Sequence, residues 1–366
     1  MTLLLKEVIK IYIAHAVTGV VFHIAIINSF NSQYANNMKT FKILLLFCVH
    51  VHCSEKNRLT NKKIYANLKK SLESIKNSCG EICDQTIKGK PGAFFDHIKK
   101  NVNCEALFRN PDIDASSDFP HPPQRIPKWL LPDYNYGGRV EVAKNYIDET
   151  HSTNLLQNWP KEPLTKMREM IKNDTFSGPY GIEYVRQINT YMKDHIDIKG
   201  KDVLIIGSQI PWIEMIAVLN EAKSVTTMEY NVITTDYPGL ILMTNIEFIE
   251  KYLSGKLPKY DVIVSFSSIE HSGLGRYGDN LNPWGDLIAM AKAWCVSKPG
   301  AKALIGFPFG KDRVVFNSHK IYGPVMLSHV FANWKLIHTN ADWNKFSEEC
   351  DWCYEPLFLL NRECDE

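Results

Sequence analysis

The sequence carries almost no net charge and is rich in neither glycine nor proline. Its 42 Lys and Arg side chains are balanced by 40 Asp and Glu side chains, which leaves a formal charge of +2. So small a charge creates no long-range field that would attract nucleic acid or an acidic polymer, and we expect no nucleic-acid partner. The 20 glycines and 18 prolines among 366 residues are too few for collagen or for a wholly disordered chain.

Apolar residues are abundant, but they do not form the repeated long runs of a polytopic membrane protein. Hydrophobic residues make up 45% of the chain and charged residues 22%, a composition typical of a protein that buries a core. The length of 366 residues corresponds to one large domain or to two of ordinary size.

Residues 1–54 are predicted to be a targeting segment. The stretch MKTFKILLLFCVHVHCS, which begins at Met38, has a basic start, an apolar run and a small-residue cleavage site, and so predicts a signal peptide over residues 38–53. The protein is then secreted or resides in the lumen of the secretory pathway. Residues 9–27 form a second apolar stretch, which as a signal anchor would associate the chain with a membrane. The alternative is that translation starts at Met38.

Nine cysteines agree with an oxidising compartment. If Cys48 and Cys53 leave with the signal peptide and Cys295 is a buried free thiol, six cysteines remain, and the sequence does not choose among their 15 pairings. Cys350 and Cys353 could instead bind zinc, although only Cys364 follows them and a structural zinc site needs four ligands. The triplet at Asn173 is a possible glycosylation site.

Composition divides the remaining chain into four regions. Proline-rich residues 111–133 cannot sustain a helix and predict an extended linker. The predicted regions are a helical, cysteine-containing region over 55–110, this linker, a helical cap over 134–198, and a further domain over 199–362. Within the cap, residues 139–195 are predicted to be helical, with breaks at Trp159-Pro160 and at residues 178–181.

The last region alternates between apolar strands and helices. The strands are KDVLIIGS, SVTTMEY, YDVIVSF and AKALIGFP, and the helices include PWIEMIAVLNEA and residues 287–296. WKLIHT and YEPLFLLNR form a closing pair of strands. Alternation of this kind requires a mostly parallel sheet with helices on both faces. The predicted fold class is therefore α/β, a doubly wound sheet preceded by a helical N-terminal region.

Ligands of such sheets bind at the carboxyl ends of the strands, closest to the first strand–helix turn. Here that turn is Gly207-Ser208-Gln209, where the glycine permits close approach of the backbone and the next helix offers N–H groups. Glu229 ends the second strand 22 positions later, and a carboxylate in this place can accept hydrogen bonds from both hydroxyls of a ribose. The alternative is a tight turn followed by a solvated glutamate.

A long loop follows the third strand and is rich in polar and small residues. His271 in this loop could act as the general base for an acceptor hydroxyl, because imidazole titrates near neutral pH. The neighbouring carboxylates Glu270 and Asp279 are further candidates for this proton transfer. Arg276 could bind a carboxylate or phosphate of the acceptor. An equally good interpretation of His271 is a histidine that holds its loop by hydrogen bonds.

A second polar cluster follows the strand that ends at Phe307-Pro308 and is expected at the same edge of the sheet. It comprises Asp312, Arg313, Asn317, His319 and Tyr322, of which Asp312 and His319 are predicted to contact substrate. The alternative is a solvated loop that caps the next helix.

Two levels of resemblance come from these motifs. The order VLIIGS, TTMEYN, YDVIVSFSSIEHSG and SKPGAKALIGFP resembles class I S-adenosylmethionine-dependent methyltransferases. More narrowly, SSIEHSGLGRYGDNLNPWGDLIAMAKAW and FPFGKDRVVFNSHKIYG resemble the Caenorhabditis domain-of-unknown-function 268 family, itself methyltransferase-like, over most of residues 130–360.

The resemblance implies S-adenosylmethionine as the cofactor and assigns residues to its parts. Gly207 and Ser208 match the loop for the methionine moiety, and Glu229 matches the ribose acid. The full set of implied cofactor residues is Gly207, Ser208, Gln209, Glu229, Tyr230, Ser265 and Ser267. Two features depart from the class: GSQIPWIE has one glycine where three are usual, and no clear acidic residue follows the short strand near Ile241-Leu242.

Three functions follow from these observations. The first is an O-methyltransferase of the secretory pathway, whose acceptor is a small molecule or a glycan hydroxyl. The second is a non-catalytic secreted or luminal binding protein on a degenerate methyltransferase scaffold. The third is an enzyme that handles a nucleotide-sugar at the same sheet edge. No metal is required by any of the motifs.

Overall fold

The computed structural model describes residues 61–150, 157–350 and 353–363. Residues 63–366 form one compact unit, distinct from residues 1–62, and the fold below is that of this unit. The predicted signal peptide and the second apolar stretch lie outside the described residues. Within the described residues, no helix is both long and apolar enough to span a bilayer.

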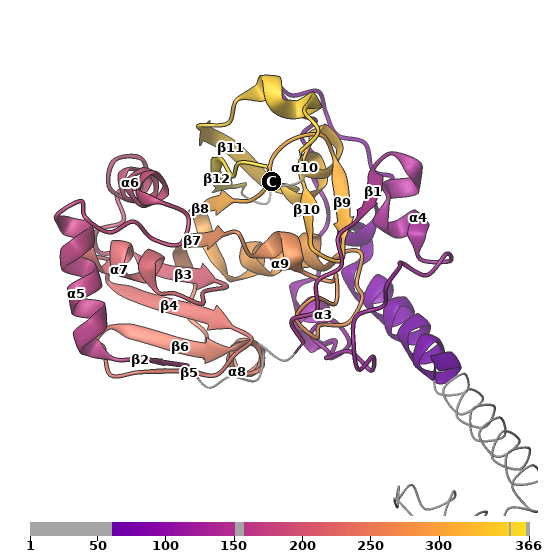
Figure 1. Cartoon of the computed structure of the whole chain (residues 1–366), viewed down its shortest axis with the longest axis horizontal. Helices are drawn as coiled ribbons and strands as arrows, with labels where there is room; N and C mark the ends of the chain where they lie inside the picture. The colour runs from indigo at the N-terminus through magenta and orange to yellow at the C-terminus, as the bar shows by residue number, and fades with distance from the viewer. Residues whose placement is uncertain (1–60, 151–156, 351–352, 364–366) are drawn as a thin grey trace, which may run out of the picture. The chain divides into compact units, whose positions relative to one another are not determined.

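A seven-stranded sheet forms the centre of the unit, in the order β11-β12-β8-β7-β3-β4-β6 (Figure 1). Five neighbouring strands are parallel: β3 (Asp202–Ile206), β4 (Ser224–Glu229), β6 (Leu240–Thr244), β7 (Tyr260–Phe266) and β8 (Ser297–Gly306). The edge pair β11 (Trp334–Thr339) and β12 (Leu357–Arg362) is antiparallel, and β12 inserts between β11 and β8. The strand order reverses at β3, which is the switch point of a doubly wound sheet. The predicted fold class is confirmed.

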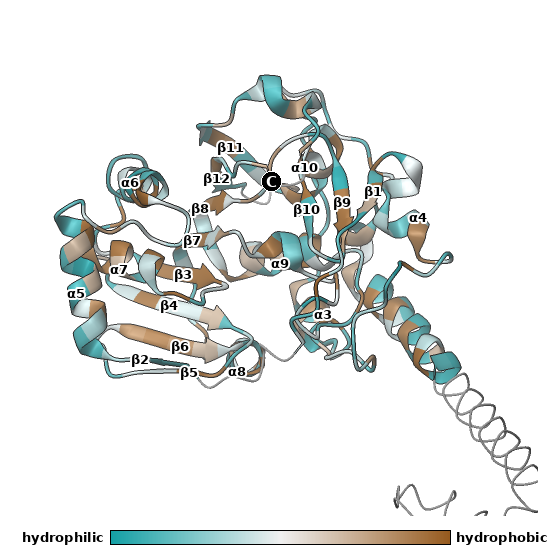
Figure 2. Cartoon of the chain, viewed as in Figure 1, coloured by the Kyte–Doolittle hydropathy of each residue, from teal (hydrophilic) through white to brown (hydrophobic). Residues whose placement is uncertain are grey.

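Each face of the sheet buries its own core, because successive side chains of a strand point to opposite faces. Val203 and Ile205 of β3 belong to a core shared with α5 (Lys161–Lys172), α6 (Ile182–Thr190), η5 (Tyr191–Ile196) and α7 (Trp212–Leu219). Leu204 and Ile206 belong to the opposite core. The helices on that side are α3 (Cys104–Arg109), α8 (Asn245–Leu253), α9 (Gly285–Val296) and α10 (Pro324–Val330). Figure 2 shows the apolar colour concentrated in the central strands and the polar colour on the outside of α5.

The segments before β3 also pack on this core. Residues 63–79 are helical, and their apolar side chains Leu68, Leu72 and Ile75 are buried in the same cluster as α9. The 3₁₀ turn η2 (Gly80–Cys83) and helix α4 (Leu131–Tyr134), followed by η3 (Tyr136–Gly138), complete this side. The boundaries predicted for the N-terminal region, linker and cap remain predictions.

The expectation that residues 139–195 are helical is wrong for their first part. Residues 161–172 and 182–196 are helical, but Glu141–Lys144 is strand β1 and Gln157–Trp159 is strand β2. β1 runs parallel to β9 (Arg313–Phe316), which pairs in turn with β10 (His319–Ile321), and β2 pairs with β5 (Ile233–Thr235). Arg313 and His319 of the second polar cluster therefore lie on a strand pair and not in an open loop. These short strands depend on partners about 75 to 170 residues away, which local periodicity does not reveal.

The disulfides differ from two cysteine predictions. Cys295 is not a free thiol, since it pairs with Cys104 and so joins α9 to α3. Cys350 pairs with Cys353, with a Cα separation of 5.4 Å, so the two form a disulfide and not half of a zinc site. Cys79 pairs with Cys83. Within the described part of the chain, no group of three or more metal-ligating side chains is placed to hold an ion.

Candidate functional site

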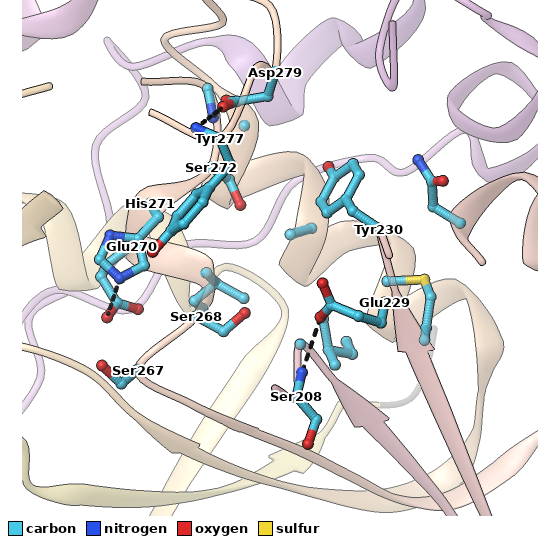
Figure 3. Close-up of a pocket in the computed structure, with 18 of the residues that line it drawn as sticks. Ser208, Glu229, Tyr230, Ser267, Ser268, Glu270, His271, Ser272, Tyr277 and Asp279 are labelled. Atoms are coloured by element: carbon cyan, nitrogen blue, oxygen red, sulfur yellow. Dashed lines mark hydrogen bonds and ion pairs between the residues drawn. The ribbon is translucent and has the colours of Figure 1, made fainter. Parts of the chain in front are cut away.

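A cavity of about 890 Å³ opens at the carboxyl ends of β3, β4 and β7. Its floor is the turn after β3, one wall comes from β4 and α8, and another comes from the loop after β7 (Figure 3). Residues 113–116 and Glu149, which precede the sheet in the chain, also line it. The volume falls in the range of sites for cofactors and drug-sized ligands, and the position is the one at which doubly wound sheets bind them.

Gly207 makes the turn after β3 possible. Its φ of +74° is in the left-handed region, which favours glycine. A Cβ at this position would collide with the Cβ and hydroxyl of Ser268 in the loop after β7. The missing side chain therefore makes room for Ser268, so that the first and fourth loops of the sheet meet beside the cavity.

Glu229 closes β4 with its carboxylate at the cavity. The Ser208 N–H donates to its Oε2 at 2.9 Å, which fixes the carboxylate against the first turn. Burial raises the pKa of Glu229, while the backbone N–H groups of Ser208, Tyr230 and Asn231 act in the opposite direction. Figure 3 shows the carboxylate between Ser208 and the ring of Tyr230, which is half exposed at the rim.

Trp212 is a wall of the cavity. It is 4% exposed, and its ring packs at 5.8 Å from Phe266 and 6.2 Å from Tyr180. Trp212, Phe266 and Tyr180 thus form an aromatic cluster, and all three line the cavity.

Asn245 was not predicted from the sequence, and it occupies the position after β6 where no acidic residue was found. Asn245 is the first residue of α8, is 8% exposed and lines the cavity. Thr244 and Glu247 form a capping box around it. The T-x-x-E pattern in TNIE could have located this helix start, and hence Asn245 at the sheet edge.

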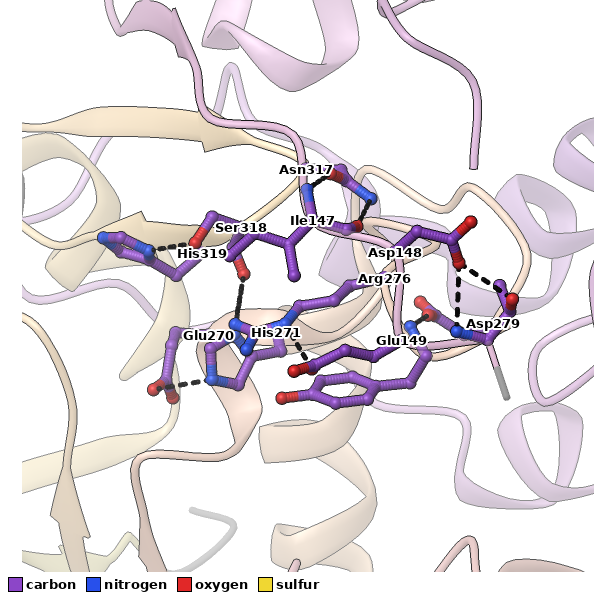
Figure 4. A network of polar contacts seen from close by, with 12 residues as sticks. Ile147, Asp148, Glu149, Glu270, His271, Arg276, Asp279, Asn317, Ser318 and His319 are labelled. Carbon is purple, nitrogen blue, oxygen red and sulfur yellow. Dashed lines mark hydrogen bonds and ion pairs between the residues drawn. The ribbon is translucent and has the colours of Figure 1, made fainter. Parts of the chain in front are cut away.

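His271 is held firmly in the loop after β7. Its Nδ1 lies 2.8 Å from the Ser318 carbonyl, so this nitrogen carries the proton and donates, while Nε2 lies 3.5 Å from Oε1 of Glu270 (Figure 4). Burial, with the nearby charge of Arg276, lowers the pKa of His271 to about 3. The imidazole lines the cavity as a neutral group that hydrogen-bonds its loop to the turn between β9 and β10.

Arg276 and Asp279 also line the cavity, and both have partners within the protein. The guanidinium of Arg276 binds Glu149 at 2.8 Å and covers the ring of Tyr277 at 4.9 Å. Asp279 accepts hydrogen bonds from the N–H groups of Gly273, Gly275 and Tyr277, at 2.8 to 3.3 Å. Its carboxylate therefore shapes the glycine loop.

Of the predicted residues His319, Ser265 and Asp312, only His319 lines the cavity. His319 lines the cavity, and its Nδ1 lies 2.8 Å from the Ser318 hydroxyl. Ser265 is buried within the sheet and donates to the Ile206 carbonyl, so it joins β7 to β3 and does not line the cavity. Asp312 is also absent from the lining, which corrects its prediction as a substrate residue. It accepts hydrogen bonds from three N–H groups at the start of α10, as the alternative interpretation of this cluster described.

Glu355 also lines the cavity, and it was not predicted from the sequence. It precedes β12, lines the cavity, and its Oε1 accepts a hydrogen bond from the Ser267 hydroxyl at 3.1 Å. Glu270, on the short turn η6 (Ile269–His271), is completely buried nearby. Burial raises the pKa of Glu355 to about 7 and raises that of Glu270 well above its ordinary value. The signal in the sequence was a charged residue followed by Pro356 and the apolar residues of β12.

The charges that line the cavity are predominantly negative. Arg276 is paired with Glu149, and Lys292 is paired with Asp114. The remaining carboxyl groups are Glu229, Glu270 and Glu355, because Asp279 is committed to backbone N–H groups. An interior of this kind favours neutral or cationic ligands over anionic ones.

One family model matches the part of the chain that contains most of the sheet. Residues 200–351 match the model of a family described as a Caenorhabditis protein of unknown function, DUF268. The resemblance predicted from the motifs is confirmed over these residues, a shorter segment than the expected 130–360. No curated protein matches the chain.

Solved structures similar to this chain include several methyltransferases. One is a magnesium protoporphyrin IX methyltransferase from Synechocystis with bound SAH, at 8% identity and a TM-score of 0.34, covering 54% of this chain and 99% of that one. Another is an S-adenosylmethionine-dependent methyltransferase from Mesorhizobium loti, at 10% identity and a TM-score of 0.30, covering 45% and 93%. A third is a 16S rRNA methyltransferase from T. thermophilus, at 11% identity and a TM-score of 0.30, covering 49% of this chain and 42% of that one.

Proposed function

We propose that this protein binds S-adenosylmethionine in the cavity and transfers its methyl group to an uncharged hydroxyl. One observation carries the proposal: the carboxylate of Glu229 is fixed by the Ser208 N–H at the end of β4, beside an open cavity of about 890 Å³. This is the place where a ribose is bound in sheets of this topology.

The residues around the cavity fit the parts of this cofactor. Glu229 would accept hydrogen bonds from the ribose hydroxyls, and Asn245 has both a donor and an acceptor for the edge of an adenine ring. The turn at Gly207 and Ser208, against which Ser268 packs, would contact the methionine moiety. The bound cofactor supplies an electrophilic methyl group on a positively charged sulfur, and the negative lining stabilises such a cation.

The proposed acceptor is neutral. Arg276 was expected to bind a carboxylate or phosphate of the acceptor, but its guanidinium is paired with Glu149. Tyr180, Ile210 and Tyr230 are exposed at the rim of the cavity and offer apolar surface to the face of a sugar ring. Three disulfides are compatible with the oxidising lumen of the secretory pathway. A glycan hydroxyl meets all of these conditions.

Titration calorimetry with S-adenosylhomocysteine tests the cofactor assignment. We expect saturable binding by the wild-type protein and at least a tenfold loss of affinity in Glu229→Gln, because the amide accepts less strongly from two hydroxyls. Glu250→Gln, an exposed change on α8, is the matched control and should bind like wild type.

Two results would contradict this assignment. Equal affinity in Glu229→Gln and wild type would remove Glu229 from the cofactor site. No binding of S-adenosylhomocysteine by the wild-type protein at millimolar concentration would leave the non-catalytic binding protein as the better description of this scaffold.

A further inference from the structure

Two carboxyl groups from distant parts of the chain meet at one side of the cavity. Glu270 follows β7 and Glu355 precedes β12, so they are 85 positions apart in the sequence. Ser267 lies between them: its hydroxyl donates to Oε1 of Glu355 at 3.1 Å, and its N–H donates to the Gly306 carbonyl at 2.9 Å. Figure 3 shows the Ser267 hydroxyl pointing toward Glu270.

The backbone at this point is under strain. Ser267 has a φ of +50°, a conformation that residues other than glycine rarely adopt. The surrounding sheet must hold it there, and such outliers are concentrated at functional sites. The conformation aims the Ser267 hydroxyl at Glu355 from the end of β7.

The surroundings do not neutralise the two carboxyl groups. Glu270 is 0% exposed, and among the described residues neither of its oxygens nor Oε2 of Glu355 has a hydrogen-bond partner. His271 places Nε2 at 3.5 Å from Oε1 of Glu270, while Arg276 is paired with Glu149. The phenol groups that face the pair are those of Tyr180, Tyr184, Tyr277 and Tyr322.

Electrostatic effects favour the protonated form of both Glu270 and Glu355. Burial is the main reason that the pKa of each carboxyl is raised, and the charge of Glu355 raises the pKa of Glu270 further. Two carboxyl groups that interact in a dry site do not both ionise readily, so each disfavours the charged form of the other. Glu355, which lines the cavity and has a pKa of about 7, is the member placed to exchange a proton with a ligand.

We infer that Glu355 is the general base of methyl transfer, and that Ser267 and buried Glu270 position it and set its affinity for a proton. The inference rests on the proposed function. As the acceptor oxygen forms a bond to the methyl carbon, the bond from that carbon to sulfur breaks and its electron pair stays on sulfur. The acceptor O–H bond breaks in the same reaction, and its proton passes to a carboxylate oxygen of Glu355.

His271 is the competing base, and its contacts give it another role. Its Nδ1 donates to the Ser318 carbonyl and Nε2 faces Glu270. A histidine with a pKa of about 3 accepts a proton poorly at neutral pH, whereas a carboxylate near 7 is matched to the task.

The first experiment follows the carboxyl groups without any ligand. Carbon-13 NMR of protein labelled at the glutamate carboxyl carbon, in a Glu214→Gln background, should show resonances from this pair that titrate far above the ordinary range. The background removes buried Glu214, whose pKa is also raised to about 7. In Glu355→Gln one of these resonances should vanish, and the other should move to lower pH because a charge has been removed. Titration of every glutamate at its ordinary value would overturn the inference, whatever the function of the protein.

The second experiment measures catalysis with defined probes. Transfer of a tritiated methyl group from S-adenosylmethionine to a mixture of neutral methyl glycosides should fall at least 100-fold in Glu355→Gln. Binding of S-adenosylhomocysteine should stay within twofold, which also shows that the variant is folded. Glu355→Asp should keep part of the activity, together with the acid limb of the kcat/KM profile that the glutamine variant loses. Full activity in Glu355→Gln, combined with a 100-fold loss in His271→Asn, would assign the base to His271.

Discussion

At the scale of single residues, burial decides what a carboxyl group in this protein can do. Glu214, in the first turn of α7, is completely buried and accepts a hydrogen bond from the Thr227 hydroxyl at 2.8 Å. Its second oxygen has no hydrogen-bond partner among the described residues. Burial raises its pKa from 4.5 to about 7. The same effect acts at Glu355, which lines the cavity.

Glu214 predicts a pH dependence of stability. Because its pKa is higher in the folded protein than in the unfolded chain, the folded protein holds a proton that the unfolded chain has released between about pH 4.5 and 7. The free energy of unfolding therefore falls as pH rises through this window, by about 3 kcal/mol in total. In Glu214→Gln this contribution should be absent, so the variant should gain stability relative to wild type from pH 5 to 8.

Urea unfolding at four pH values between 5 and 8 measures this difference. Glu250→Gln, an exposed change, should follow the wild-type curve. A constant difference between Glu214→Gln and wild type across the range would mean that Glu214 is already charged at pH 5.

A site residue was predictable from the sequence where it lies at the end of one recognisable strand. Gly207 and Glu229 follow apolar runs that could only be central strands, and the carboxyl edge of such a sheet is where ligands bind. The roles of the flanking polar residues were not predictable, because they depend on partners elsewhere in the chain. Arg276 is occupied by Glu149, and Glu355 reaches the cavity only because β12 inserts beside β8.

At the scale of elements, short segments are fixed by side chains that lie far from them in sequence. Helix α10 begins at Pro324, and the carboxylate of Asp312 accepts hydrogen bonds from the N–H groups of Gly323, Val325 and Met326 at 2.8 to 2.9 Å. These are donors that the first turn of a helix cannot satisfy by itself. Asp312 thus connects α10 to the segment that precedes β9.

Removing this cap should affect stability and not ligand binding. Asp312→Ala is expected to lower the free energy of unfolding by about 1–2 kcal/mol, as the loss of other capping side chains does. Asp312→Asn keeps one acceptor oxygen and should lose less. Calorimetric titration should give the same affinity for S-adenosylhomocysteine in both variants, because Asp312 does not line the cavity. A selective loss of affinity with unchanged stability would return Asp312 to the site.

The elements themselves were predictable in proportion to how apolar and regular they are. The runs that became β3, β7 and β12 are rich in Val, Ile and Leu, and the structure has strands there and at the other predicted places, β4, β8 and β11. Strand β1 has the sequence EVAK and only one strongly β-forming residue, so pairing with β9, and not its own composition, makes it a strand.

At the scale of the whole unit, covalent and ionic links join the N-terminal segments to the sheet domain. The disulfide between Cys104 and Cys295 connects α3 to α9 across 191 positions of sequence. Lys292, one turn earlier on α9, pairs with Asp114 at the cavity. The described segments between residues 63 and 198 therefore belong to the unit that contains the cavity.

Replacing both cysteines tests how much this link contributes. Cys104→Ser combined with Cys295→Ser opens a loop of about 190 residues, for which the chain-entropy model gives a loss of roughly 4–5 kcal/mol. Denaturant unfolding should show this loss, and reductant should then destabilise the double variant less than it destabilises wild type. Unchanged stability in the double variant would show that the two cysteines do not pair in the native protein.

Strand β12 and the cavity-lining segments that precede the sheet have a practical consequence for the preparation of recombinant protein. The segment that matches the family, residues 200–351, ends before Glu355 and begins after residues 113–116 and Glu149, all of which line the cavity. A recombinant polypeptide trimmed to those limits would expose the apolar side of α9 and lack the inferred base. Sequence comparisons confined to the same window would leave out Glu149 and Glu355.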